Sequence, residues 1–279
     1  MNSAQRAWLD GLVCERLAAD DVNDDLRLDF ENDRVESLAD FIAAPDTFDK
    51  DIGGDIAVYV IKDAGVIIAF FSLQCGNIFE KVIKDEDWRF YELYQLFSKG
   101  KLTPDEYAEL LNYQAVHNLS DEKMKHEAEK IELRIWEVGA KKNDEAQFEQ
   151  SDNVNLVHRI YPAIEIVHFC RNDNYYGLFS DLFPGQRLGQ VLFMCVIVPE
   201  LRKIRRGIGC RYIYLFAVTN ERDNKLVSHY TDNYGFRADT GYGVSKSLHE
   251  SGCLFMAQPL DGLFARAASF DPAAPELAD

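Results

Sequence analysis

The stretch CRYIYLFAVTNERDNKLVSHYTDNYGF, residues 210–236, decides the fold of this chain. Aromatic and aliphatic side chains alternate over residues 210–218, and this period of two predicts a strand. A helical pattern then covers residues 224–233, and the pair Gly235-Phe236 predicts the start of another strand. A strand, a short helix and a second strand in this order indicate an α/β protein.

Other strands are predicted upstream and downstream of this unit. Residues 56–62 and 66–73 are rich in Val, Ile and Phe, and the loop Asp63-Ala64-Gly65 predicts a hairpin whose register stays open. Residues 163–170 form a further predicted strand, and residues 253–260 form the last one.

The apolar run at residues 189–198 allows two interpretations. Its β-branched residues suit a strand. A helix reaching Arg206 would instead have to absorb Pro199, either by a kink or by starting a second helix there.

Two parts of the chain have helical patterns. Residues 1–45 are predicted to be helical, and Pro45 closes the second helix of this part. Residues 77–152 carry helical periodicity with almost no strand character, and we interpret them as an insertion of two to four helices. Thr103 and Pro104 suit the start of one of these helices. The aromatic group between Trp88 and Phe97 predicts the core of the insertion or, alternatively, a surface for dimerisation or a partner.

The chain is acidic and rich enough in apolar residues to fold. Its formal net charge is -17, which disfavours a broad nucleic-acid-binding surface, and 47% of its residues are hydrophobic. The six cysteines have no metal-ligand spacing, so we expect reduced thiols and no metal site. Neither a signal peptide nor a membrane span is predicted, so we expect a cytoplasmic location.

Residues 218–236 resemble the last core unit of the GNAT N-acetyltransferases, where a strand is followed by Asn, a short helix with an aromatic pair, and Gly-Phe. The resemblance implies a mixed, mostly antiparallel sheet flanked by helices. It also implies transfer of an acetyl group from acetyl-CoA to a primary amine, with the pantetheine arm between two diverging strands, residues 163–170 and 210–218. The resulting division is 1–76 and 153–265 for the two parts of the GNAT-like domain, 77–152 for the helical insertion, and 266–279 for a flexible tail.

The same resemblance assigns roles in the last unit. A tyrosine on its helix protonates the departing thiolate as a general acid. The usual position of this tyrosine is taken by Thr231, and Tyr230 stands beside it, so either the helix is offset by one residue and Tyr230 serves, or the acid is missing. Asn224 would contact the cofactor at the start of the helix.

The strand at residues 163–170 resembles the family strand that precedes the phosphate loop. Glu165 matches a glutamate that acts as general base in some members, and its alternative role is a solvated edge residue. The resemblance also implies that the backbone at Phe169 and Arg171 binds pantetheine.

The phosphate loop itself is matched by residues 183–192. Gly185 and Gly189 would allow close approach of the pyrophosphate to a helix N-terminus. Arg187 stands where the family has a glycine, and we expect it to pair with a phosphate of the cofactor. The glycine-rich segment at residues 205–209 directly precedes a strand, so we interpret it as a helix C-terminus instead.

Several alternatives for function remain at this point. A catalytically weak or inactive module could use the insertion as its partner surface. The N-terminal segment Phe30-Glu31-Asn32-Asp33 resembles GNAT toxins that act on aminoacyl-tRNA, although the net charge favours a cationic amine over tRNA. The acceptor and the oligomeric state, including a homodimer, stay open.

Overall fold

The computed structural model describes residues 1–81, 83, 85–143, 157–175, 177–218, 225–238, 241–244 and 252–272. The chain divides into two compact units. The first contains Met1–Ile78, Tyr161–Thr240 and Val244–Asp279, and the second contains Phe79–Ile160 with Gly241–Gly243. In the described part of the chain, no helix has the length and apolar character needed to cross a bilayer.

The strands of the described residues join into one seven-stranded sheet. They are β1 (Val13–Arg16), β2 (Ala57–Asp63), β3 (Val66–Lys81), β4 (Val157–Arg171), β5 (Tyr212–Val218), β6 (Tyr242–Gly243) and β7 (Cys253–Pro259). Their order is β1-β2-β3-β4-β5-β7, with β6 paired to β3. The pairs β1–β2, β2–β3, β3–β6 and β5–β7 are antiparallel, whereas β4 and β5 are parallel. The predicted mixed, mostly antiparallel sheet is confirmed.

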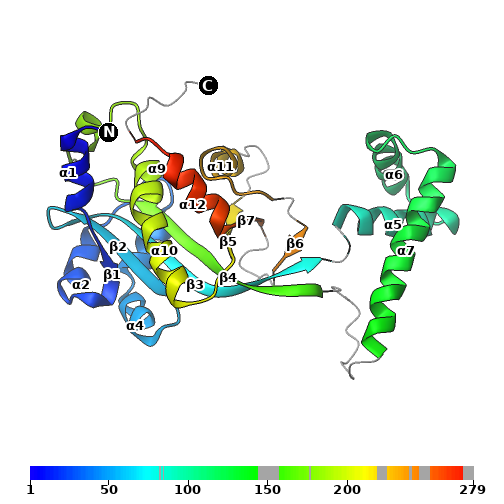
Figure 1. Ribbon diagram of the computed structural model, residues 1–279, viewed down its shortest axis with the longest axis horizontal. Coiled ribbons are helices and arrows are strands. Elements are labelled where there is room, and N and C mark those ends of the chain that lie inside the picture. Colours follow the sequence, from blue (N-terminus) through cyan, green and yellow to red (C-terminus); the bar gives the residue numbers. More distant parts are fainter. Residues whose placement is uncertain are drawn as a thin grey trace. The chain divides into compact units, whose positions relative to one another are not determined.

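Helices cover both faces of the sheet in the first unit (Figure 1). One face carries α9 (Leu188–Leu192), α10 (Val198–Gly207) and α12 (Leu260–Ser269), whose apolar residues share a core with Ile61, Phe71 and Ile213. The opposite face carries α2 (Val22–Leu26), α3 (Glu36–Ala43) and α4 (Pro45–Gly53), around a second core with Val58 and Val60. The remaining helices of this unit are α1 (Ser3–Gly11), α8 (Phe179–Leu182) and α11 (Lys225–His229).

The prediction that residues 1–45 are helical is wrong at β1. Helix α1 ends at Gly11, and Leu12 is extended with φ −70° and ψ 134°. β1 then pairs with β2 from Val13↔Lys62 to Arg16↔Tyr59. The apolar spacing looks helical only because a short helix and a short strand follow each other, and the pairing with β2 decides the conformation. Pro45 marks the end of the second helix as predicted, because α3 ends at Ala43 and the extended Ala44 caps it directly before the proline. Pro45 also opens the next helix, since it occupies the first turn of α4.

The hairpin between β2 and β3 has a two-residue turn, tighter than the predicted three-residue loop. Asp63 pairs with Val66, and both central residues are left-handed, with φ 48° at Ala64 and φ 85° at Gly65. Positive φ at both positions matches the twist of the flanking strands. The register shifts between Ile61 and Lys62, which indicates a β-bulge.

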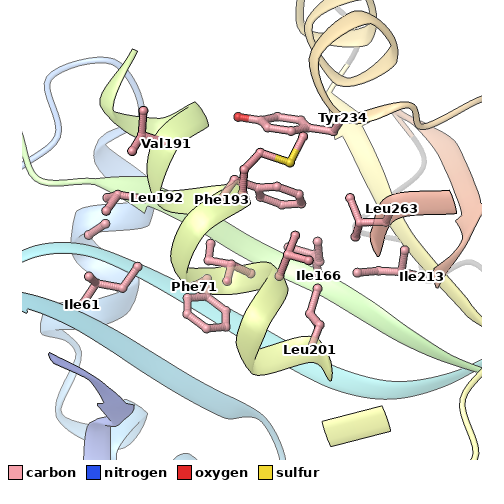
Figure 2. Close-up of a cluster of buried hydrophobic side chains, with 14 of the residues drawn as sticks. Ile61, Phe71, Ile166, Val191, Leu192, Phe193, Leu201, Ile213, Tyr234 and Leu263 are labelled. Carbon is pink, nitrogen blue, oxygen red and sulfur yellow. The ribbon is translucent and has the colours of Figure 1, made fainter. Parts of the chain in front are cut away.

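The ambiguous run at residues 189–198 is helical. Helix α9 continues through a π-helical turn, Phe193–Ile197, into α10. Pro199 has no N–H to donate to the preceding turn, and its ring crowds a carbonyl of that turn. The wider π turn directly before it accommodates both effects. In the resulting core, Phe193 lies beside Tyr234 with their ring centroids 4.2 Å apart (Figure 2).

The second unit is built from α5 (Asp85–Ser98), α6 (Pro104–Val116) and α7 (Asp121–Asn143). Thr103 caps α6 with a reciprocal capping box to Glu106, and Pro104 opens the helix as predicted. The predicted aromatic group splits, since Leu93 faces the core whereas Trp88 and Phe97 are exposed. Strand β3 extends to Lys81, so the prediction of almost no strand character is wrong for residues 77–81.

The end of the chain also differs from the sequence prediction. Gly235 is left-handed with φ 83°, and among the described residues that directly follow it, 236–238, the predicted strand is represented by a bridge between Arg237 and Ala257. Helix α12 follows β7 directly and reaches Ser269, so it enters the range predicted to be a flexible tail.

Candidate functional site

The central feature of the site is the short ladder between β4 and β5. The parallel pairing runs from Ala163↔Tyr212 to Ile166↔Leu215 and includes four residue pairs. β5 continues past this point on its other side, paired with β7 up to Val218↔Cys253. Residues 167–171 of β4 therefore lie beyond the last pair, and the pairing of the two strands ends at Ile166.

The side chains of β4 change faces where the pairing ends. Ile164 and Ile166 face the core under α10. Strict alternation would put His168 on that same face, yet it stacks on Phe41 of α3, with ring centroids 4.0 Å apart, on the opposite side of the sheet. Phe169 in turn lies 5.7 Å from Phe193, between ring centroids, on the α10 side. One residue is thus inserted in the pleat near Val167, as in a β-bulge.

The main chain beyond the bulge has a defined direction. The N–H of Asn172 donates to the carbonyl of Ile68 on β3 at 2.8 Å. Because main-chain groups alternate in direction along a strand, those of Phe169 and Arg171 point away from β3. The carbonyl of Arg171 accepts a hydrogen bond from Asn32 Nδ2 at 3.2 Å. Of the two predicted pantetheine contacts, Phe169 fits the expected direction, and the carbonyl of Arg171 already has a side-chain partner.

The predicted phosphate loop leads into a helix that begins at Leu188. Gly185 is left-handed with φ 79°, a conformation that favours glycine, and Arg187 is an extended N-cap residue. Gly189 lies against Phe169, because a Cβ built on Gly189 would lie 3.8 Å from Phe169 Cζ. The loop and the unpaired end of β4 are therefore in contact.

The glycine-rich segment at residues 205–209 is the C-terminus of α10, as the sequence predicts. The helix ends at Gly207, with Arg205 and Arg206 in its last turn. Asn224, the remaining predicted contact, lies outside the described residues.

Tyr230 begins a second π-helical turn, Tyr230–Tyr234, directly after α11. The N–H groups of Phe236 and Gly235 close this turn on the carbonyls of Tyr230 and Thr231, at 3.1 and 3.0 Å. A π turn holds one more residue than an α turn. An extra residue in this turn is what a one-residue offset between Tyr230 and Thr231 would require.

The two neighbouring hydroxyls have different surroundings. Burial raises the pKa of the Tyr230 hydroxyl to about 12, with a smaller contribution from the Cys170 thiol, although part of the Tyr230 side chain stays accessible. Thr231 is exposed, and its hydroxyl donates to the carbonyl of Val227 at 2.9 Å. A phenol with this pKa keeps its proton at neutral pH, as a proton donor must.

Glu165 is placed by its partner on the next strand. It lies opposite Tyr214 in the ladder, and the Tyr214 hydroxyl donates to Glu165 Oε2 at 2.8 Å. Tyr214 in turn fills the space above Gly76 of β3, because a Cβ on Gly76 would lie 2.1 Å from the Tyr214 hydroxyl oxygen. The carboxylate is thus held one residue before the point where β4 and β5 separate.

The sequence alone does not point to three residues that hold the site. Tyr214 stands out only as part of an alternating strand, and Gly76 has no signal beyond being a glycine next to a strand. Asn32 belongs to the segment Phe30-Glu31-Asn32-Asp33, but its partner Arg171 is 139 positions away, and no local pattern connects them.

The comparisons with known proteins complete the description of the site. Neither a family model nor a curated protein matches the chain. Among solved structures, a bacterial toxin aligns at a TM-score of 0.47 with 11% identity over 93% of this chain and 97% of its own. A mutant of the toxin AtaT bound to the C-terminus of its antitoxin AtaR and acetyl-CoA gives 0.45 and 11%, over 91% and 96%. A complex of AtaT with acetyl-methionyl-tRNAfMet gives 0.43 and 11%, over 90% and 95%.

Proposed function

We propose that this chain is a GNAT-type N-acetyltransferase that moves an acetyl group from acetyl-CoA to a primary amine. The observation that carries the proposal is the early end of the β4–β5 ladder at Ile166↔Leu215. Beyond it, the main chain of Phe169 offers hydrogen-bonding groups to an extended ligand such as pantetheine, in the manner of an added strand.

The phosphates of CoA are proposed to bind at the loop before α9. The helix that starts at Leu188 continues through the π turn to Gly207, so its first N–H groups and its dipole favour an anion. Gly189 leaves room beside Phe169, and the exposed Arg187 adds a positive charge at the same end.

The chemistry follows from two side chains. The amine nitrogen attacks the thioester carbonyl, a C–N bond forms, the C–S bond breaks, and the products are an amide and a thiol. Glu165 takes the proton that the amine loses, directly or through a water molecule, and Tyr230 supplies the proton that the thiolate gains. The Tyr214 hydroxyl orients the carboxylate of Glu165.

The acceptor is proposed to be a cationic amine. A formal net charge of -17 attracts polyamines, aminoglycosides or lysine-rich peptides. The same charge repels the phosphates of a tRNA that carries an amino acid, such as the one in the AtaT complex. A gel shift with aminoacyl-tRNA at low salt tests this preference, and a retarded band would overturn it.

Two observations favour a second candidate, a GNAT-like module with weak or no catalysis. Arg187 stands in place of a glycine, and Asn32 occupies the carbonyl of Arg171. In that case the insertion, with exposed Trp88 and Phe97, would provide the partner surface.

Titration calorimetry with acetyl-CoA separates the two candidates. The enzyme should give saturable heat, and Gly189→Asp should remove it, because a carboxylate at this helix start repels the pyrophosphate. Gly209→Asp is the matched control, since no atom lies within 4 Å of a Cβ at Gly209 in the rival glycine-rich segment. The absence of heat from the wild type at millimolar ligand would sink the enzyme proposal.

Turnover is measured as release of the CoA thiol with spermidine, an aminoglycoside and a lysine-rich peptide. Binding of acetyl-CoA without thiol release above the rate of the Tyr230→Phe variant would favour the non-catalytic module.

A further inference from the structure

The π turn that carries Tyr230 leaves main-chain carbonyls without helical partners. The chain leaves the helix at the left-handed Gly235, so the described residues that follow, 236–238, do not continue the helical hydrogen-bond ladder to the carbonyls of Asp232 and Tyr234. Two side chains from the end of the chain bind them instead. Arg266 Nη1 donates to the Asp232 carbonyl at 2.9 Å, and Gln258 Nε2 donates to the Tyr234 carbonyl at 2.9 Å.

Gly235 permits this close approach. A Cβ at this position would lie 3.0 Å from Arg266 Nε and 3.3 Å from Gln258 Oε1. Both side chains therefore pack directly on the backbone where the π turn ends, and only a glycine leaves them enough space.

The two donors belong to one rigid piece of structure. Gln258 is in β7, which pairs with β5 along its whole length, and Arg266 is on α12, which starts immediately after β7. A reciprocal pair of hydrogen bonds between Arg237 and Ala257, at 3.1 and 2.9 Å, ties the segment after Gly235 to the same strand. The turn with Tyr230 is thereby fixed to the strand next to β5.

We infer that Gln258 and Arg266 are positioning residues that hold the π turn so that the Tyr230 hydroxyl points at the departing sulfur. The inference rests on the proposed function and adds a role for β7 and α12, part of which the sequence assigns to a flexible tail. π-helical turns are rare and occur mostly as single turns next to α-helices, frequently at functional sites.

The first test compares Arg266→Gln and Gln258→Met with the wild type. Each variant removes one donor and keeps most of the side-chain volume. We expect kcat to fall about ten- to hundred-fold, because a displaced proton donor loses its alignment, while KM for acetyl-CoA changes little. Arg266→Lys keeps one donor and should recover part of the loss. Arg202→Gln is the matched control, since Arg202 also binds a main-chain carbonyl, that of Phe264, but away from the turn.

A double-mutant comparison distinguishes a positioning role of Arg266 from a general effect on stability. If Arg266 acts through Tyr230, then adding Arg266→Gln to Tyr230→Phe should cause no further loss of kcat. A loss that is equal in both backgrounds would overturn the inference, as would wild-type kcat in both single variants.

A spectroscopic readout keeps the inference testable without turnover. In protein labelled with 3-fluorotyrosine, the Tyr230 signal is identified by its disappearance in Tyr230→Phe. We expect this signal to shift in Arg266→Gln and Gln258→Met, and its titration midpoint to fall as the phenol becomes more accessible. An unchanged signal overturns the positioning role, whereas missing acetyl-CoA binding or thiol release in the wild type overturns the proposed function alone.

Discussion

Glu165 and Tyr214 are opposite each other in the last but one pair of the β4–β5 ladder, joined by a hydrogen bond of 2.8 Å from the tyrosine hydroxyl to the carboxylate. The pair marks the place where the strands separate, since only Ile166↔Leu215 follows it. A polar pair at this position gives the proposed base a fixed orientation next to the proposed path of the thioester.

Glu165→Gln should lower turnover with the accepted amine by roughly 100-fold or more, because an amide cannot take the proton from the amine. The affinity for acetyl-CoA, measured by calorimetry, should stay the same. Tyr214→Phe keeps the carboxylate and should lower kcat/KM for the amine by less than about ten-fold. Wild-type turnover in Glu165→Gln would leave this residue a structural partner of Tyr214 and exclude it as the base.

The roles of Tyr230 and Thr231 are distinguished by removing each hydroxyl in turn. Tyr230→Phe should lower kcat by about 100-fold or more and keep acetyl-CoA binding, because the buried phenol is the proposed proton donor. Thr231→Val should retain most of the activity, since the Thr231 hydroxyl is exposed and bonded to the Val227 carbonyl. Steady-state kinetics on both variants checks this, and the reverse ranking would place the acid at Thr231.

The sequence predicts those parts of the fold that depend on local patterns. The alternation in β5, the hairpin of β2 and β3 and the Thr103 cap are all visible as periods or capping residues. β1 could not be predicted, because four residues next to a helix acquire strand geometry only through pairing with β2.

In the candidate site, too, some residues are predicted from local sequence and others depend on contacts distant in the chain. Glu165, Tyr230 and the loop glycines follow from a resemblance of short segments, but the offset between Tyr230 and Thr231 depends on a π turn that no local pattern announces. The roles of Asn32 and Arg266 depend on contacts with carbonyls distant in sequence. Every residue has the same main-chain carbonyl, so the sequence does not indicate which carbonyl accepts the hydrogen bond of Asn32 or Arg266.

Gly76 provides a stability test of the Tyr214 position. In Gly76→Ala the new methyl group would lie 2.1 Å from the Tyr214 hydroxyl oxygen and 2.8 Å from two ring atoms. The ring must move, so we expect a loss of about 1–3 kcal/mol in unfolding free energy and a lower Tm. Gly262→Ala in α12, where nothing lies within 4 Å of a new Cβ, is the control and should keep or raise Tm. An unchanged Tm in Gly76→Ala would contradict the packing of Tyr214 on β3.

The lowered pKa of His168 predicts how the stability of the fold depends on pH. Its ring lies partly buried between Phe41 and Ser72, with Nδ1 2.7 Å from the Ser72 hydroxyl, and this burial lowers its pKa from 6.5 to about 4. Between these values the unfolded chain binds a proton that the folded chain does not, so stability falls as the pH drops from 6.5 to 4, by up to about 3 kcal/mol for this group. Urea unfolding across this range should therefore give a shallower pH slope for His168→Gln than for the wild type. Ser72→Ala keeps the buried imidazole and should keep the wild-type slope, because burial and not the hydroxyl lowers the pKa. Equal slopes for His168→Gln and the wild type would show that the imidazole is already protonated, or already accessible to water, in the folded protein.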